Sequence, residues 1–477
     1  MSGQATAADT DLAFAGAARQ AEMVRAGEVT PTELVRLYLG RIERLNPELN
    51  AFRKVFAEKA LLEAEQAEAR IKAGEERPLL GVPIAIKEES DVAGEVTTHG
   101  TDAYDQPASA DCEMVRRLRE SGAIILGITL APELKIFPFT ESATYGISRN
   151  PWNLQRSPGG SSGGSAGAVA AGLVPIASAG DGGGSIRFPA AFCGLFGLKP
   201  TRGRISIAPE RELWNGLAVL GCVSRTVLDT ALWLDVTAGG SQEPDAPSPP
   251  ERPFVEAARA EPGKLRVAYS TLAPRAALPA VVSDPIRGAV ADAAELLRSL
   301  GHDVAQEDPA WGGVGDNISV RYLRGVADDF ATVPHPERLE RRTRGLARLG
   351  RMLPDGLFER AVRSGREADN ARVNAIFDSH DVLVTPVMGT TALPVRRWEG
   401  QGALRTVLGM SRYCSYCIPW NHLGNPAMSV PMGFADDGMP LAVQVIARHG
   451  EEATLLSLAA QIEAARPWAD KLPPLAE

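Results

Sequence analysis

Residues 157–185 read SPGGSSGGSAGAVAAGLVPIASAGDGGGS, and this stretch decides how the chain folds. A segment so rich in glycine and serine would ordinarily be interpreted as a flexible linker. Here, however, residues 166–173 have the small side chains of a packed helix and residues 174–177 predict a strand, and a linker contains neither. The two glycine clusters therefore indicate places where the backbone approaches another group closely or adopts conformations that other residues avoid.

Short apolar runs alternate with helical stretches on both sides of this segment. Before it, residues 81–86 and 124–126 predict strands, and residues 113–120 predict a helix. After it, residues 265–269 and 381–385 predict further strands. This alternation is typical of an α/β fold.

Two other segments shape the expected organisation. Residues 34–67 predict two amphipathic helices with a break at Pro47, because proline lacks an amide donor and restricts the residue before it. Residues 239–262 are rich in proline, serine, glutamate and alanine and predict an exposed connector. The pattern leaves open whether this connector separates two domains or loops out from one sheet.

Composition and charge indicate which partners and which cellular compartment to expect. The 477 residues are 44% hydrophobic and carry a net charge of −9, so nucleic acid is not an expected partner. No run of about 18 uncharged apolar residues predicts a membrane span, and residues 1–23 lack the pattern of a signal peptide. Five irregularly spaced cysteines fit a reducing compartment, and the isolated pair Cys414 and Cys417 lacks the further ligands of a zinc site. We expect a cytoplasmic protein without a metal.

Two kinds of glycine-dependent site fit the segment poorly. Neither the P-loop pattern nor G-x-G-x-x-G occurs there, so no motif supports a nucleotide-binding site. The nucleophile-elbow pattern G-x-S-x-G occurs three times, but an elbow follows a core strand, and residues 150–158 contain two prolines and no strand pattern. If there were an elbow, His422 or His449 would have to serve as its base.

Lys87 offers a different base. Only eight of the 50 basic residues are lysines, and Lys87 ends the apolar run 81–86, which would carry its amine into the protein. Desolvation lowers the pKa of a lysine and can leave a neutral amine that accepts a proton near pH 7. An ion pair with Glu88 or Glu89 is the structural alternative, and the residues themselves leave both interpretations open.

Several segments in order resemble the amidase signature enzymes, and the resemblance covers nearly the whole chain. The signature is a Gly-Gly-Ser-Ser-Gly-Gly-Ser run followed by Asp-x-Gly-Gly-Ser-Ile-Arg-x-Pro. The matching segments are GGSSGGS at 159–165, DGGGSIRFP at 181–189, GVPIAIKE around Lys87, GLFGLKPTRGRIS at 194–206, DVLVTP from 381 and NPAMSVPMGF at 425–434.

The resemblance implies a set of site residues. Lys87 would be the base, Ser161 a bridging serine that follows a cis peptide bond from Gly160, and Ser185 the nucleophile. No metal or cofactor is implied. The remaining implied roles are an oxyanion hole formed by the amides of Gly182, Gly183, Gly184 and Ser185, and support of the glycine loop by Asp181 and Ser162.

The implied fold is a single α/β unit over residues 1–477, a mixed, mostly parallel twisted β-sheet flanked by helices on both faces. It would comprise a helical part at 1–75, the signature core at 76–238, the connector at 239–262 as an excursion, and a C-terminal half at 263–477 that adds strands to the same sheet.

The implied reaction is hydrolysis of the C–N bond of a linear amide through an acyl-enzyme. Carbamate or ester hydrolysis, or the role of a glutaminase-type subunit in an amidotransferase complex, are the alternatives. The expected partner is a small-molecule amide rather than nucleic acid or a membrane, and a homodimer is left open. Gly180 and Gly182 stand where many members carry threonine and a bulkier residue, so the substrate preference is not implied.

Overall fold

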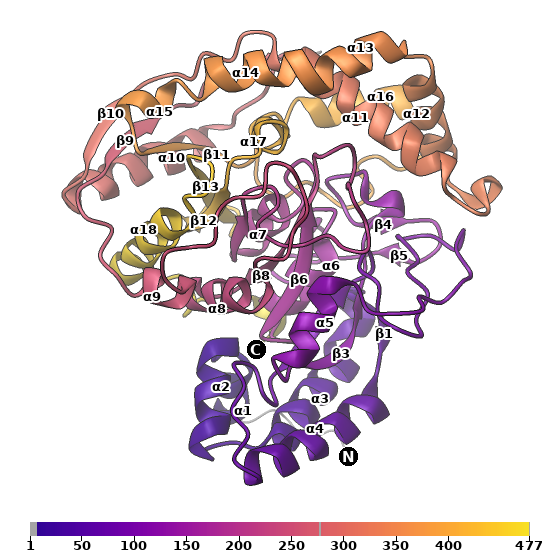
Figure 1. The fold of residues 1–477 in the computed structure, drawn as a ribbon, viewed down its shortest axis with the longest axis vertical. Helices are drawn as coiled ribbons and strands as arrows, with labels where there is room; N and C mark the ends of the chain where they lie inside the picture. Colours follow the sequence, from indigo (N-terminus) through magenta and orange to yellow (C-terminus); the bar gives the residue numbers. More distant parts are fainter. Residues whose placement is uncertain (1–6, 276–277, 477) are drawn as a thin grey trace.

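The computed structural model describes residues 7–275 and 278–476, which form one 11-stranded mixed sheet and one small two-stranded sheet (Figure 1). The strands of the large sheet lie in the order β1-β3-β2-β6-β8-β7-β12-β13-β11-β9-β10. The small sheet pairs β4 (Glu141–Ser142) with β5 (Gly146–Ile147). The bounds of the large sheet's strands are β1 Phe52–Val55, β2 Pro83–Lys87, β3 Ile124–Thr129, β6 Ile176–Asp181, β7 Phe196–Lys199, β8 Val219–Ser224, β9 Arg266–Tyr269, β10 Asp303–Gln306, β11 Val382–Pro386, β12 Ala427–Phe434 and β13 Pro440–Ala447.

Strands from both halves of the chain meet in the middle of the large sheet. Parallel pairs join β2 to β3 and β6, and join β9 to β10 and β11, whereas the strands between these groups pair antiparallel. There β7 pairs with β12, so that Lys199 lies opposite Ala427. Many of the strands are buried along their whole length, as expected for a sheet covered on both faces.

A layer of helices covers each face of the sheet. Each layer packs against the strand side chains that point to its own face. Ile84 and Ile86 of β2 pack with one layer, whereas Ala85 packs with the other, because successive side chains of a strand point to opposite faces. The predicted α/β unit with helices on both faces is confirmed. The first layer contains α2 Ala17–Ala26, α5 Glu113–Glu120, α8 Val227–Thr237, α9 Phe254–Ala258, α10 Asp284–Ser299 and α18 Glu452–Ala465, and the second contains α1 Ala7–Ala13, α3 Pro31–Leu49, α4 Ala57–Lys72, α6 Gly163–Ala170 and α7 Arg187–Cys193.

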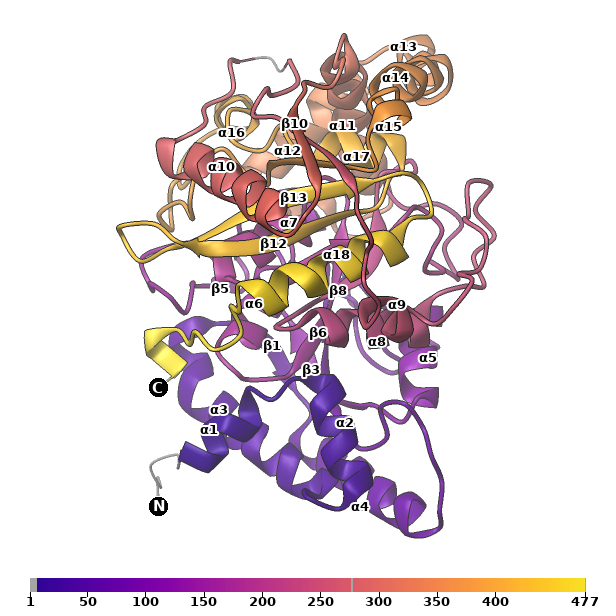
Figure 2. The same cartoon turned by 90° about the vertical axis from the view of Figure 1, so that its left-hand side faces the viewer.

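A further group of helices lies at the end of the molecule opposite α1–α4, as Figures 1 and 2 both show. None of the described helices is long and apolar enough to cross a membrane. The group consists of α11 Val314–Ala331, α12 Arg341–Arg351, α13 Asp355–Arg360, α14 Arg366–Val373, α15 Ile376–Ser379, α16 Ala403–Ser411 and α17 Ile418–Leu423, with a π-helical turn at Ala361–Gly365 and short 3₁₀ turns elsewhere at Glu133–Lys135, Pro336–Arg338 and Pro474–Ala476.

The predicted helix break at Pro47 is wrong. Helix α3 continues through Pro47 and ends at Leu49, after which Asn50 adopts a left-handed conformation with φ of 50°. The side chain of Asn46 accepts hydrogen bonds from the amides of Ala51 and Phe52, at 2.8 and 2.9 Å. These bonds stabilise the backbone where it leaves the helix. Because Pro47 lies in the last turn of α3, the helix loses only one amide donor to it.

Part of the predicted connector is packed rather than exposed. Residues 254–258 form α9, in which the side chain of Phe254 is only 1% exposed. The carboxylate of Asp235 on α8 accepts hydrogen bonds from the amides of Phe254 and Val255, at 2.6 and 3.0 Å. A side chain outside the connector therefore caps this helix, and periodicity within the connector could not predict it.

Candidate active site

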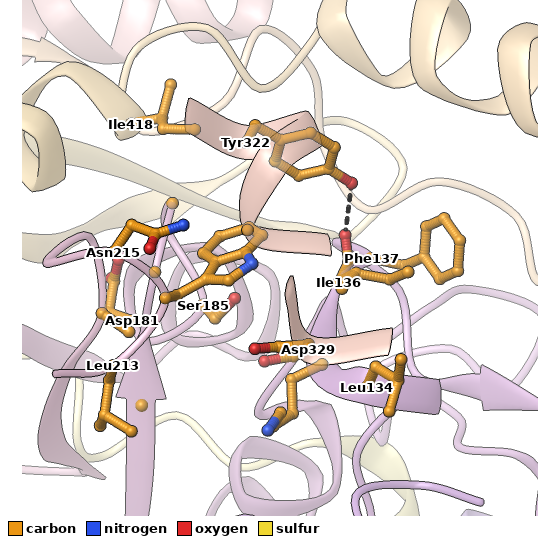
Figure 3. A pocket seen from close by; sticks show the side chains of 18 of the residues that line it. Leu134, Ile136, Phe137, Asp181, Ser185, Leu213, Asn215, Tyr322, Asp329 and Ile418 are labelled. Carbon is orange, nitrogen blue, oxygen red and sulfur yellow. Dashed lines mark hydrogen bonds between the residues drawn. The ribbon is translucent and has the colours of Figure 1, made fainter. Parts of the chain in front are cut away.

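A cavity of about 740 Å³ lies between the glycine-rich segment and the helices α11, α16 and α17. Apolar side chains form much of its wall, among them Leu134, Leu213 and Ile418 (Figure 3). The hydroxyl of Tyr322 on α11 donates a hydrogen bond to the carbonyl of Ile136 at 2.8 Å, which joins α11 to the loop that forms the opposite wall. The C-terminal half thus encloses a site built largely by the N-terminal half.

Ser161 and Ser185 both line this cavity, and Lys87 lies behind Ser161. The fully buried amine of Lys87 is 2.8 Å from the Ser161 hydroxyl oxygen. A cis peptide bond joins Gly160 to Ser161, as the resemblance implied. The backbone amide of Lys87 donates to the hydroxyl of Ser178 on β6 at 2.7 Å, which holds the end of β2 in place. The structure therefore brings the predicted base, bridging serine and nucleophile to one site.

The Lys87 amine also contacts a carboxylate, 3.0 Å from Oε1 of Glu89. Burial lowers the pKa of Lys87, whereas the negative charge of Glu89 raises it and the nearby Lys135 lowers it further. Glu88 points elsewhere, because its carboxylate accepts hydrogen bonds from the Thr98 hydroxyl at 2.6 Å and the Ala131 amide. Lys87 thus contacts both Ser161 and Glu89, so the ion pair that the sequence left open is formed with Glu89 and the amine also lies beside a serine.

Asp181 organises the glycine loop that carries Ser185. Its carboxylate accepts hydrogen bonds from the amides of Gly184 and Ile186, at 2.6 and 3.1 Å, and from the fully buried guanidinium of Arg187 at 2.8 Å. Burial disfavours the charged carboxylate, but Arg187 outweighs this effect and holds the pKa of Asp181 well below its usual range. The loop after β6 is therefore folded around one buried ion pair.

This arrangement corrects one detail of the predicted oxyanion hole. The amide of Gly184 is bound by Asp181, so it does not point into the cavity as the sequence analysis expected. The amides of Gly182, Gly183 and Ser185 remain as candidate donors. Ser162 lies in the supporting loop: its amide donates to the carbonyl of Ser185 at 3.3 Å, and its hydroxyl is 3.3 Å from both the amide and the carbonyl oxygen of Gly180.

The two glycines that depart from the common pattern each make room for a side chain in the cavity. A Cβ atom on Gly180 would lie 2.2 Å from Oε1 of Glu89. A Cβ atom on Gly182 would lie 2.6 Å from the indole of Trp214. Both distances are too short for van der Waals contact, so a Cβ atom at either position would require the side chain of Glu89 or Trp214 to move from its present place.

The histidines of the alternative elbow lie outside the site. The ring nitrogen atoms of His422 are 3.1 Å from Asp369 and 2.9 Å from Arg321. Neither His422 nor His449 is among the described residues that line the cavity. Among the described residues, moreover, no group of three or more histidine, cysteine, aspartate or glutamate side chains is placed to hold a metal ion.

Sequence reasoning missed two residues that complete the site. The side-chain amide of Asn421 on α17 donates to the carbonyl and the carboxylate of Asp181, at 2.7 and 2.9 Å. Because 240 residues separate the partners, no local signal could have found this contact. The sequence carried a weak local signal for Trp214, because Trp-Asn-Gly at 214–216 indicates a turn. In the structure all three residues have positive φ.

Comparison with known proteins agrees with this geometry. A family model described as Amidase matches residues 33–456. The chain is 50% identical over 465 residues to "Putative amidase AmiB2" of Mycobacterium tuberculosis, covering 97% of this chain and 99% of the relative. It is 34% identical over 483 residues to an acylamidase of Rhodococcus erythropolis, covering 98% of each. The fold matches that of 6-aminohexanoate cyclic dimer hydrolase, solved with substrate, with a TM-score of 0.87, 31% identity, and coverage of 98% of this chain and 100% of that one. The chain therefore belongs to the amidase signature family and is an enzyme that hydrolyses amides.

Proposed function

We propose that this enzyme cleaves the C–N bond of a carboxylic amide with Ser185 as the nucleophile, activated through Ser161 by the neutral amine of Lys87. The observation that supports this most directly is the 2.8 Å contact between the buried amine of Lys87 and the hydroxyl of Ser161, in the wall of a cavity that Ser185 also lines. A neutral amine next to a hydroxyl is a general base in position to act.

The proposed reaction begins with proton transfer. Lys87 takes a proton from Ser161, which takes one from Ser185, and the oxygen of Ser185 forms a bond to the carbonyl carbon of the amide. The amides of Gly182, Gly183 and Ser185 stabilise the negative charge on the carbonyl oxygen. The proton returns along the same path to the leaving nitrogen as the C–N bond breaks, and water then hydrolyses the acyl-enzyme.

The cavity favours amides with apolar substituents. Its wall carries Leu134, Leu213, Ile418 and the indole of Trp214, together with ionisable residues that include Lys135, Glu210, Glu212, Asp328 and Asp329. The proteins that this chain is similar to include an acylamidase and 6-aminohexanoate cyclic dimer hydrolase, so family members act on amides of different kinds. We propose aryl or alkyl amides as the substrate class of this chain.

A substrate panel tests the proposal. The full chain is assayed with an anilide, a primary amide, a carbamate and an ester that share one acyl group, and glutamine is included. We expect turnover of the anilide or the amide, loss of turnover in Ser185→Ala, and an acyl adduct on the wild-type Ser185 peptide by mass spectrometry. Preference for the carbamate, the ester or glutamine would favour the corresponding alternative. An adduct on another residue would contradict the assignment of Ser185.

We also propose that the enzyme works in a reducing compartment such as the cytoplasm. Its five cysteines are all free thiols, and four of them are buried, where they pack as small apolar side chains. Cell fractionation of the native host checks this expectation.

A further inference from the structure

Glu89 touches the base of the proposed relay, and the mechanism described above does not use it. The amides of Glu89 and Ser90 both donate to the carbonyl of Lys87, at 2.7 and 3.1 Å, so the chain turns sharply at the end of β2. This turn brings the carboxylate of Glu89 to 3.0 Å from the amine of Lys87. The turn thus lets the side chains of Lys87 and Glu89 meet on the same side of the chain.

A second element leaves room for this carboxylate. Gly180 lies on β6, which pairs directly with β2, and a Cβ atom there would lie 2.2 Å from Oε1 of Glu89. Any other residue at position 180 would therefore push the carboxylate away from its place. Glu89 also lines the cavity with a side chain that is 13% exposed, so its carboxylate is enclosed rather than freely hydrated.

Lys87 is surrounded by several charges of both signs. Glu89 follows it in the chain, Asp181 ends β6 nearby, and Lys135 lies on the 3₁₀ turn Glu133–Lys135. Glu88 is also near, but burial raises its pKa to about 7, so it is only partly charged at neutral pH. His99 is also near, and burial lowers its pKa well below the usual range, so His99 is neutral. Among these groups Glu89 has the strongest effect on the proton of Lys87 and favours the ammonium form.

We propose that Glu89 is a positioning residue that holds the amine of Lys87 against Ser161 and increases its basicity. This inference rests on the proposed function, in which Lys87 is the base. A fully buried lysine can have a pKa as low as about 5–6, and so weak a base would take a serine proton poorly. The carboxylate offsets part of the desolvation, and Gly180 allows it to reach the amine.

The pH dependence of Ser185 reactivity tests this role, and an alkyl fluorophosphonate is the probe. The probe forms a phosphorus–oxygen bond to the activated serine and releases fluoride, so its labelling rate reports on the relay without a known substrate. Removing the carboxylate destabilises the ammonium form of Lys87 and therefore lowers the pKa of Lys87. In Glu89→Gln we therefore expect the rise of the labelling rate with pH to move down by about 1–2 pH units, and the rate on the high-pH plateau to fall.

Four variants serve as controls. Gly180→Ala should shift the pH profile in the same direction because the added Cβ displaces the carboxylate, and Glu89→Gln/Gly180→Ala should shift it no further than Glu89→Gln alone. Glu89→Asp keeps the charge on a shorter side chain and should fall between the wild type and Glu89→Gln. Glu210→Gln removes a charge from an exposed position at the cavity and should leave the profile in place.

The outcomes separate this inference from the proposed function. If the profile of Glu89→Gln stays in place or moves to higher pH while Ser185 is still labelled, Glu89 does not tune Lys87 and the inference is wrong. If Glu89→Gln does not fold, Gly180→Ala decides by the same criterion. If the wild type is not labelled at Ser185, or Ser185→Ala is labelled equally fast, the proposed function itself fails and this inference with it.

Discussion

At the scale of single residues, Lys87 has three properties that a proton acceptor at this position needs. It is fully buried, its amine is 2.8 Å from Ser161, and burial lowers its pKa from that of an exposed lysine. An exposed lysine with a pKa of about 10.4 would be almost wholly charged at neutral pH and could not accept a proton. The activity should therefore depend on the fraction of Lys87 that is neutral.

Lys87→Arg tests this dependence. We expect wild-type kcat/KM to rise with pH through one deprotonation between about pH 6.5 and 9, because Lys87 becomes neutral as the pH passes its pKa. Arginine keeps the charge but does not lose its proton, so Lys87→Arg should be about 10²–10⁴-fold less active at every pH. Steady-state rates from pH 5 to 10, with circular dichroism to verify folding, measure both. A folded Lys87→Arg enzyme with most of its activity would show that Lys87 acts only as a fixed charge.

At the scale of elements, the loop between β6 and α7 depends on the buried pair of Asp181 and Arg187. Asp181 ends β6 and Arg187 begins α7, so their 2.8 Å ion pair fixes the angle between the strand and the helix. Asn421 on α17 joins the same carboxylate from the C-terminal half. The position of Ser185, which lies between the two ions in the chain, is therefore set by contacts from three elements.

Asp181→Asn should destabilise the protein strongly. The substitution leaves the guanidinium of Arg187 buried without its counter-ion, and breaking a buried pair in this way costs about 3–5 kcal/mol. Glu295→Gln is the matched control, because it breaks an exposed pair with Arg298 within α10 and should cost less than about 1 kcal/mol. Chemical denaturation of both variants at pH 7 gives the free energies of unfolding. Equal costs for the two variants would contradict the stabilising role of the buried pair.

At the scale of the whole molecule, the two halves of the chain share one sheet and one cavity. Strand β7 from the N-terminal half pairs with β12 from the C-terminal half, and α11, α16 and α17 close the cavity over Ser161 and Ser185. Separating the halves would expose the edges of β7 and β12 and the apolar layers on both faces. Unpaired edges and exposed apolar surface favour aggregation over independent folding.

Expression of residues 1–248 and 249–477 as separate chains tests this expectation. The cut lies in the exposed part of the connector, so it removes no helix or strand. We expect neither fragment alone to show a cooperative thermal transition by circular dichroism, and we expect co-expression to restore some Ser185 labelling. A cooperative transition in either fragment alone would show that the chain contains two independent domains.

Much of the fold follows from local sequence, because strands and helices are encoded in short periodic runs. The apolar run before Lys87 is β2, and residues 113–120 are α5, as predicted. The helix predicted at 166–173 and the strand predicted at 174–177 correspond to α6 at Gly163–Ala170 and β6 at Ile176–Asp181, so their type was right and their bounds were not. The resemblance of the serine and glycine pattern to the amidase signature likewise indicated Ser161 and Ser185.

The sequence by itself therefore determined the class of fold, its main elements and the candidate residues Lys87, Ser161 and Ser185. Only the tertiary structure decided how charge is arranged around them. It placed Glu89 rather than Glu88 beside Lys87, directed the amide of Gly184 to Asp181, and brought Asn421 to the same carboxylate from 240 residues away. The physical reason is that a side chain's charge state and hydrogen bonds depend on every neighbour within a few ångströms, and most of those neighbours are distant in the chain.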